Sequence, residues 1–153
     1  MRIQGKFAMP SLIGIARRSK PKAIMEPVKQ AAVTMASGVQ GDARGKPGKR
    51  QVTVLSADVW SEVCSSLGVE LEWSKRRANL LVAGIRFSAK DIGRKLVVGS
   101  ILLEVRCECD PCHRMDQVHP GLRKALEPEW RGGVCCTVVQ EGLVQIGDAV
   151  DWL

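Results

Sequence analysis

The segment CDPCHRM, from Cys109 to Met115, places two cysteines, a histidine and an arginine within a few residues of one another. Three kinds of chemistry fit these residue types. The segment could supply half of a structural zinc site, it could form a redox-active dithiol, or it could carry a single reactive thiolate. The residues around the segment therefore have to be weighed for each alternative.

A structural zinc site usually has four ligands that arrive as two close pairs. Cys109 and Cys112 supply one pair, and Cys107 or His113 could add a third ligand. The second pair is missing, because Cys135 and Cys136 are adjacent in the chain. A redox dithiol of the thioredoxin kind opens a helix after a strand, whereas here the flanking residues predict a strand before the motif and a loop after it.

The third alternative is a single reactive thiol at Cys112, which follows Pro111 and precedes His113 and Arg114. Positive charge from these two neighbours stabilises a thiolate, and a thiolate is a good ligand for a transition metal that accepts sulfur. His113 is also a candidate proton donor, because imidazole titrates near neutral pH. Spacing alone leaves all three alternatives open.

The charge of the chain is distributed unevenly. Residues 1–50 hold eleven Lys or Arg but only Glu26 and Asp42 as acids, a net charge of +9. The rest of the chain has a net charge of −2, which gives the total of +7. Such a basic region suits a phosphate-bearing ligand or a nucleic acid. Nucleic acid is not the expected partner, since the chain has no Tyr and two Phe for base stacking. A small anionic ligand fits better.

Two segments are candidates for holding that anion. In the glycine-rich loop 38–50, backbone N–H groups can turn toward an anion while Arg44, Lys49 and Arg50 add charge. Asp42 is expected to form an Asx turn there and not to be a ligand. The second segment lies just before a predicted strand. Its candidates are Arg77 and Asn79, which alternate with Ala78 and should therefore point to the same side, while Arg76 is expected at the surface.

The pattern of strands predicts a mainly β protein, a closed or partly open β-barrel with a few short helices. A helix is expected after Ser56, ending at Gly68, and a hairpin with its turn at residues 141–142 is expected to end the chain. We expect one domain over residues 11–153 after a flexible lead-in over residues 1–10.

No apolar run is long enough for a membrane helix, and residues 1–20 lack the features of a signal peptide. These observations predict a cytoplasmic protein without a membrane partner. In that compartment six cysteines indicate metal or thiol chemistry and not disulfides. Cys64, Cys135 and Cys136 stand in apolar patterns and are expected to be buried as small hydrophobic residues.

The ordered segments of the chain resemble the MOSC domain, named for the C-terminal domain of molybdenum-cofactor sulfurase. The resemblance runs from about Ser11 to Leu153. It rests on the following segments: GVQGDARG, RQVTVL, RRANLLVAGI, DIGRKLVVGSILLEV, CDPCHRM, RGGVCCTVV and GLVQIGDAV.

The resemblance implies a β-barrel-like fold and a molybdenum-cofactor-binding role, with Cys112 as the metal ligand or sulfur carrier and Cys109 as a more variable partner. The loop 38–50 would then bind the terminal phosphate of the anionic pterin, molybdopterin, with Arg114 also near the cofactor. Family members support sulfur transfer or reduce N-hydroxylated compounds, which implies a separate sulfur-donor or electron-donor protein here.

Sulfurases also carry a pyridoxal-phosphate-dependent desulfurase, for which 153 residues leave no room, so pyridoxal phosphate is not expected to bind this chain. The chain also lacks the run of cysteines that holds a ferredoxin-type cluster. The alternative function, from a different class, is a non-catalytic zinc- or thiol-dependent binding module.

Overall fold

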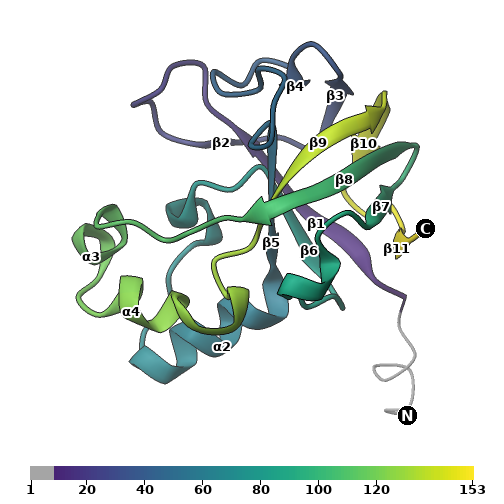
Figure 1. The fold of residues 1–153 in the computed structure, drawn as a ribbon. Coiled ribbons are helices and arrows are strands. Elements are labelled where there is room, and N and C mark those ends of the chain that lie inside the picture. Colours follow the sequence, from purple (N-terminus) through teal and green to yellow (C-terminus); the bar gives the residue numbers. More distant parts are fainter. Residues whose placement is uncertain (1–8) are drawn as a thin grey trace.

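Strands make up most of the regular structure in the computed structural model, which describes residues 9–153 (Figure 1). The strands are β1 (Ser11–Arg17), β2 (Glu26–Pro27), β3 (Gln30–Thr34), β4 (Gly38–Val39), β5 (Val52–Ser56), β6 (Leu80–Ala83), β7 (Lys95–Val98), β8 (Ile101–Glu108), β9 (Val134–Gln140), β10 (Gly142–Gln145) and β11 (Val150–Trp152). The helices are α2 (Ala57–Leu67), α3 (Arg114–Val118) and α4 (Leu122–Leu126), with 3-10 turns η1 (Trp73–Arg76), η2 (Ala89–Asp91) and η3 (Pro128–Trp130). The mainly β prediction is confirmed, while residues 1–8 of the expected lead-in lie outside the described range.

The larger sheet has eight strands in the order β11-β7-β8-β9-β5-β6-β1-β2, and its two edges do not pair with each other. The sequence predicted a closed or partly open β-barrel, and since the sheets are not closed into a barrel, the barrel is not confirmed. A bridge between Ser11 and Ala149 and a 2.8 Å hydrogen bond from the Leu12 N–H to the Asp148 carbonyl bring β1 beside the segment before β11. A turn with φ of 99° at Gly147 interrupts this segment, so the contact does not extend into a ladder.

The smaller sheet has three strands in the order β10-β3-β4 and corrects the predicted final hairpin. β10 pairs with β3, with Gly142 opposite Val33, and it does not pair with β9. β9 pairs instead with β8 up to Gln140 and with β5 over residues 134–136. In the segment 95–108, Gly99 and Ser100 connect β7 to β8 as a hairpin.

The sheet separates two hydrophobic cores, and this explains the continuous apolar runs of β5 and β6. Val54 and Leu80 face a core enclosed by the strands, while Leu55 and Leu81 face a second core beneath α2 and α4. Strands that are buried on both faces lose the usual alternation of polar and apolar residues.

Helix α2 begins and ends where the sequence predicted. The Ser56 hydroxyl accepts a hydrogen bond from the Val59 N–H at 3.3 Å, and Gly68 ends the helix in the left-handed conformation. The short helices α3 and α4 and the turn η3 lie between β8 and β9, in keeping with the few short helices that the sequence predicted. No helix in residues 9–153 has the length and apolar character needed to cross a membrane.

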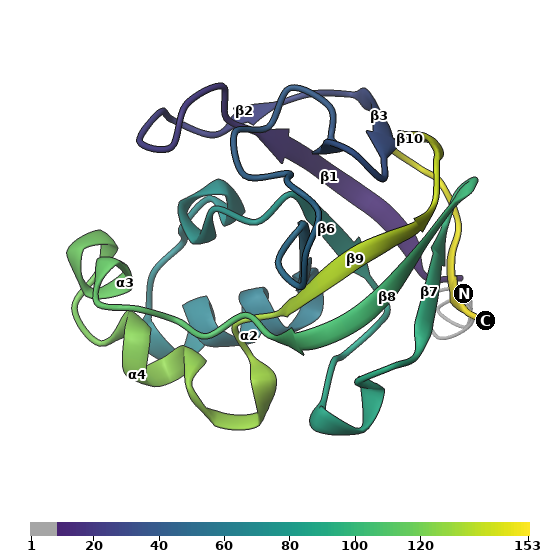
Figure 2. The same ribbon diagram turned by 45° about the horizontal axis from the view of Figure 1, so that its top comes forward.

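Several strand ends meet at one end of the larger sheet and bring distant segments together (Figure 2). Arg18 directly follows β1, and Cys109 directly follows β8. Loop 38–50 leads into β5 there, Asn79 precedes β6, and Gly133 precedes β9. The residues singled out from the sequence therefore lie at the same end of the fold, although they are far apart in the chain.

Candidate site for an anion and a reactive thiol

A cavity of about 500 Å³, called the basic cavity below, lies at this end of the sheet. A second cavity, of about 520 Å³, lies between α2 and η3, and none of the predicted site residues lines it. The basic cavity is lined by Arg18, Pro21, Lys22, Asp42, Arg44, Arg50, Thr53, Arg76, Arg77, Asn79, Cys109, Asp110, Cys112, Arg114, Met115 and Cys135.

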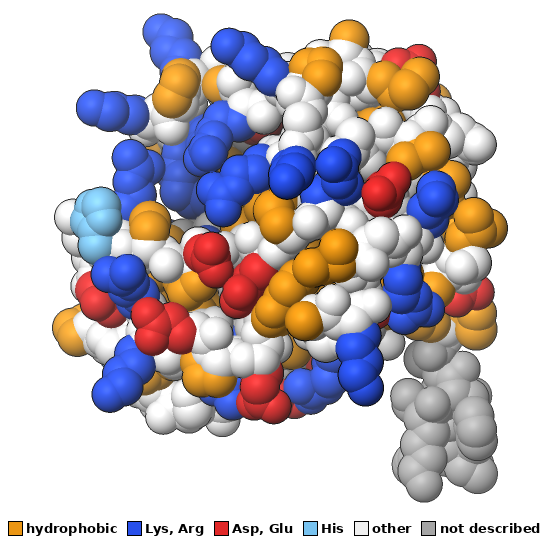
Figure 3. Space-filling model, in the orientation of Figure 1, with side chains coloured by type: hydrophobic (Ala, Val, Ile, Leu, Met, Phe, Trp, Pro, Cys, Tyr) orange, Lys and Arg blue, Asp and Glu red, His pale blue; other side chains and the backbone are white. Residues whose placement is uncertain are grey.

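The lining of the basic cavity carries seven Lys or Arg side chains against two carboxylates, a formal excess of five positive charges. Among residues 9–153, none of these seven cations forms a salt bridge. Blue side chains gather on the corresponding face of the molecule (Figure 3). The lining is therefore an electrostatic environment that an anion would stabilise.

Arg18 is the most buried of these unpaired cations, at 5% exposure. Its Nε is buried without a hydrogen-bond partner, and its Nη1 contacts only the Met25 sulfur, at 3.9 Å. Burial lowers the pKa of the Arg18 guanidinium, and the positive charges of Arg77 and Arg44 lower it further. Such a buried cation is costly unless a ligand supplies the missing negative charge.

Arg77 presents a second buried Nε without a partner. Its backbone is left-handed, with φ of 65°, and its Nη2 donates to the carbonyls of Pro21 and Ala23 at 3.2 and 2.9 Å. Burial lowers the pKa of Arg77, followed by the charges of Arg114 and Arg44. The guanidinium is thus held in place while one donor stays free.

Arg76 anchors the cysteine loop, which we define as residues 109–113. The sequence suggested a surface position, and this is wrong, since Arg76 is buried. Its Nε donates to the Gly132 carbonyl at 3.1 Å, and its Nη2 donates to the Cys109 carbonyl at 2.6 Å. A Cβ on Gly132 would approach the Cys109 carbonyl oxygen to 2.5 Å, so the glycine makes this close contact possible.

Substitution of Arg76 with Met is expected to lower the free energy of unfolding by about 2–4 kcal/mol, because two carbonyls lose a charged donor. Urea unfolding would measure the change. Lys75→Met, an exposed neighbour in η1, is the matched control and should change stability by less than about 0.5 kcal/mol. Equal effects of the two substitutions would contradict the anchoring role.

The thiols of the basic cavity have different environments. Cys112 is exposed, Cys109 is half-buried and Cys135 is buried. A hydrogen bond from the Cys135 thiol lowers the pKa of Cys109 to about 6 against desolvation, with help from Arg76, Arg50 and Arg44. The same hydrogen bond raises the pKa of Cys135. Cys109 is therefore the thiol of this pair that is ionised first.

Most, but not all, of the predicted site residues line the basic cavity. The lining includes Arg44, Arg50, Arg77, Asn79, Cys112 and Arg114, whereas Lys49 and His113 are exposed and do not line it. Asn79 uses its amide within the fold, accepting from the Thr53 N–H at 3.1 Å and donating to the Ala16 carbonyl at 3.2 Å. Asp42 forms the expected Asx turn, accepting from the Arg44 N–H at 3.3 Å.

Sequence reasoning missed Arg18 as a site residue and treated Cys135 only as a core residue. Cys135 is buried as predicted, but its side chain reaches the cavity while Cys136 faces the core. The signal available for Cys135 was the alternation of adjacent strand residues between the two faces of a sheet. For Arg18, a charged residue at the end of an apolar strand was the one hint.

The fold and the site define a class of protein, a β-rich domain with a basic cavity that combines unpaired arginines with accessible sulfur. The family model for the MOSC domain matches residues 28–151, and the chain belongs to the MOSC domain family. No curated protein matches the chain significantly.

Solved structures of similar fold agree with this membership. The YuaD protein from Bacillus subtilis aligns with a TM-score of 0.78 at 18% identity, over 94% of this chain and 96% of that protein. YiiM from Geobacillus stearothermophilus aligns with a TM-score of 0.72 at 19% identity, over 94% of this chain and 75% of that protein. YiiM from Escherichia coli aligns with a TM-score of 0.67 at 14% identity, over 93% of this chain and 69% of that protein. At these identities the likeness concerns the fold.

Proposed function

We propose that this MOSC-domain protein binds the molybdenum cofactor in the basic cavity and uses Cys112 as the protein ligand to the metal. The observation that carries the proposal is the pair of guanidinium groups of Arg18 and Arg77, whose buried Nε atoms lack partners in a cavity that also contains an exposed cysteine. The family is associated with this cofactor, and the cavity has the charge that its phosphate requires. The cysteines are all free, in keeping with a cytoplasmic protein.

The residues present fit an anionic pterin with a metal. Guanidinium groups bind phosphate oxygens through paired N–H donors, and Arg18, Arg77 and Arg44 bring such donors to one wall. Cys112 lies in the same cavity, so one ligand could contact the arginines with its phosphate and the sulfur with its metal. When bound, the cofactor would supply a centre for two-electron chemistry on oxygen or sulfur.

The chain's own part in such chemistry is to hold and orient. Arg18 and Arg77 would fix the anionic end, while Arg76 keeps the cysteine loop at a constant position by its two hydrogen bonds. Arg114 lines the same cavity as Cys112 and would add positive charge beside the bound anion. His113 is exposed next to Cys112 in the chain and would be the proton donor to a substrate that reaches this loop.

An exposed Cys112 favours a second candidate function, in which this residue carries transferable sulfur delivered by a donor protein. Reduction of an N-hydroxylated compound would need a separate electron-donor protein instead. The zinc-binding alternative has less support, because within residues 9–153 no group of three or more His, Cys, Asp or Glu is placed to hold a metal ion.

The experiment is to purify the protein and Cys112→Ser from cells that make the cofactor, and to measure molybdenum and pterin in each. We expect pterin in both, since the arginines remain. Molybdenum should fall by about tenfold or more in the variant, because a lost metal–sulfur bond is worth more than the ~1.4 kcal/mol that a factor of ten represents.

Cys64→Ser is the matched control, since Cys64 lies in the second core away from the cavity. It should retain both molybdenum and pterin. Equal molybdenum in wild type and Cys112→Ser would exclude the ligand role, and absence of pterin from all three proteins would exclude the cofactor. A mass increase of one sulfur atom on Cys112, removed by a reductant, would instead indicate sulfur transfer.

A further inference from the structure

Two thiols of the basic cavity have no role in the proposed function. Cys109 and Cys135 both line the cavity, on the segment after β8 and on β9 respectively. They come from neighbouring strands, and the Cys109 N–H donates to the Gly133 carbonyl at 2.9 Å, two residues before Cys135. The backbone thus brings these two cysteines together independently of Cys112.

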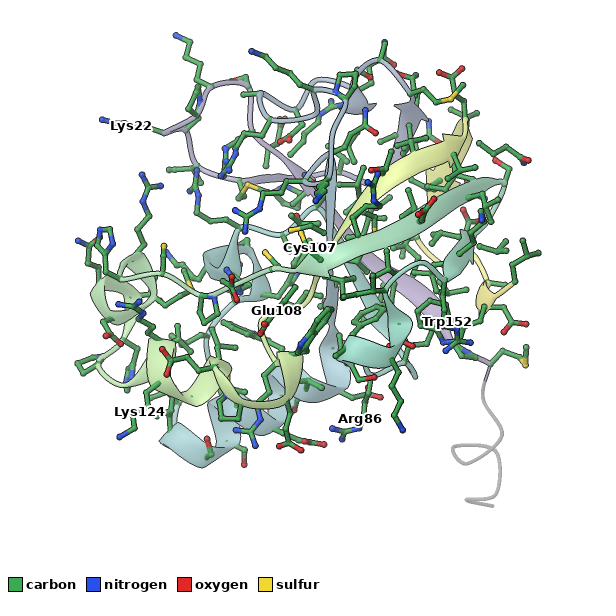
Figure 4. The ribbon with its side chains drawn as sticks, viewed as in Figure 1. Lys22, Arg86, Cys107, Glu108, Lys124 and Trp152 are labelled. Atoms are coloured by element: carbon green, nitrogen blue, oxygen red, sulfur yellow. The ribbon has the colours of Figure 1, made fainter. Side chains whose placement is uncertain are left out.

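The register of β8 and β9 places three cysteines on one side of the sheet. Cys107 lies opposite Cys135 after a bulge between Val105 and Cys107, and Cys109 follows two residues later on the same side. Cys107 lies at the end of β8, beside the region where the segments of the cavity meet (Figure 4). Of the two neighbours of Cys135 on this side, Cys109 lines the basic cavity together with Cys135, whereas Cys107 does not line it.

The surroundings of Cys109 favour its ionised form. The neighbouring Cys135 thiol lowers the pKa of the Cys109 thiol most, and the positive charges of Arg76, Arg50 and Arg44 lower it further. Opposing negative charge comes from Glu108 and Asp110, the residues on either side of Cys109 in the chain. Other titratable groups near this sulfur include Cys107, Cys135 and Cys136.

We propose that Cys109 and Cys135 form a redox-active dithiol that reduces small anionic disulfides entering the basic cavity, with Cys109 as the attacking thiolate and Cys135 as the resolving thiol. The Cys109 thiolate attacks one sulfur of the disulfide, forms a mixed disulfide and releases the first thiolate. Cys135 then loses its proton, attacks the Cys109 sulfur and releases the second thiolate. The substrate gains two electrons, and the protein ends with a Cys109–Cys135 disulfide.

The anionic substrate class follows from the charge of the cavity. A disulfide bearing carboxylates would meet seven unpaired cations on its way to Cys109. Electrostatic attraction of this kind raises association rates by about tenfold or more at low ionic strength. The half-buried position of Cys109 admits a small disulfide, while buried Cys135 is reached only through Cys109. This dithiol is independent of molybdenum and of Cys112.

The test uses 5,5′-dithiobis(2-nitrobenzoate), a disulfide with two carboxylates, on the protein with Cys107→Ser and Cys112→Ser, called the parent below. We expect a rapid release of one thionitrobenzoate from attack and a second from resolution, and a protein without adduct whose mass has fallen by two hydrogens. Adding Cys109→Ser should remove the rapid phase. Adding Cys135→Ser or Cys135→Ala should leave a stable mixed disulfide on Cys109.

A persistent adduct on Cys109 in the parent, or a rapid phase that survives Cys109→Ser, would overturn the proposal. So would a disulfide joining Cys107 to Cys135 when wild type is oxidised and mapped by mass spectrometry. Circular dichroism would establish that each variant is folded before its rate is interpreted. Two replacements of Cys135, by Ser and by Ala, are made so that the test can be completed if one of them does not fold.

The substrate class has its own measurement. The neutral 2,2′-dithiodipyridine serves as the comparison, with each rate divided by that of a free small thiol. The anionic probe should show about a tenfold advantage at low salt, lost at high salt. The rate should rise as pH passes about 6, where Cys109 loses its proton, and level off below the range of an ordinary thiol at 9.0. Equal normalised rates for both probes would exclude the anionic class.

Discussion

Replacing Arg18 with Met is expected to stabilise the protein in the absence of anions while removing its response to phosphate. The free energy of unfolding should rise by about 1–3 kcal/mol in a buffer without multivalent anions. In wild type, inorganic phosphate should raise the melting temperature as its concentration increases, and in Arg18→Met this increase should largely disappear. A gain in stability together with a loss of ligand response is the signature of a functional buried charge.

The physical reason lies in the partners that Arg18 lacks. Its side chain makes no hydrogen bond to oxygen, and its contact with the Met25 sulfur recovers little of the lost hydration. Methionine has a similar length and no charge, so it should pack in the same space against Met25 without the desolvation cost. Arg76 provides the contrast, because it is equally buried but donates to two carbonyl oxygens.

The sign of the pKa shift leads to the same expectation. The folded-state pKa of Arg18 lies below that of the unfolded chain, so the folded state binds its proton less tightly. A base shifted in this direction destabilises the fold at every pH below its folded pKa, which includes the whole neutral range. This destabilisation is removed only at strongly alkaline pH or by a bound anion, which restores the pKa of Arg18.

The matched control is Arg17→Met, since Arg17 is the preceding residue and lies outside the cavity lining. Arg17 donates to the Gln40 carbonyl at 2.8 Å and lies 3.8 Å from the Glu26 carboxylate. Its replacement should leave the response to phosphate intact and should not stabilise the protein. Thermal melts of the three proteins across a phosphate titration measure both effects. An unchanged phosphate response in Arg18→Met would refute the anion site at this position.

Local signals in the sequence predicted the elements whose partners lie nearby in the chain. Ser56 and Gly68 mark the ends of α2 because a cap is satisfied within one turn of helix. Loop 38–50 and the cysteine loop were recognised because the properties that matter there, glycine flexibility, positive charge and thiol chemistry, can be read directly from the residue types. Four predicted cations reached the cavity for this reason: Arg44, Arg50, Arg77 and Arg114.

Features that depend on distant strand pairing could not be predicted. β10 pairs with β3, which lies far from it in the chain, and not with the adjacent β9, and no local pattern encodes this choice. Arg76 was assigned to the surface because its hydrogen-bond partners, on Gly132 and Cys109, lie 56 and 33 residues away. Burial of a cation is a property of the assembled site and is not visible in the segment that carries it.

Replacing Gly133 with Ala is expected to destabilise the protein by about 3–5 kcal/mol, the range of severe single substitutions. Gly133 has φ of 98°, and a Cβ there would lie 2.4 Å from the Val54 carbonyl oxygen. That oxygen belongs to β5, whose ladder with β9 begins at Val54 opposite Val134. The added methyl group would therefore push apart two central strands at the edge of the basic cavity.

Gly93→Ala separates the clash from the cost of a left-handed backbone. Gly93 has a similar φ of 88°, but a Cβ there would meet no atom within 4 Å, so its substitution should cost about 1 kcal/mol. Urea unfolding of both variants gives the difference, which reports the contact with Val54 alone. Because the Gly133 carbonyl accepts the Cys109 N–H, Gly133→Ala should also slow the reaction of Cys109 with disulfides. Equal costs for the two glycines would mean that β5 and β9 separate without resistance, and the close packing that we assign to this end of the sheet would be wrong.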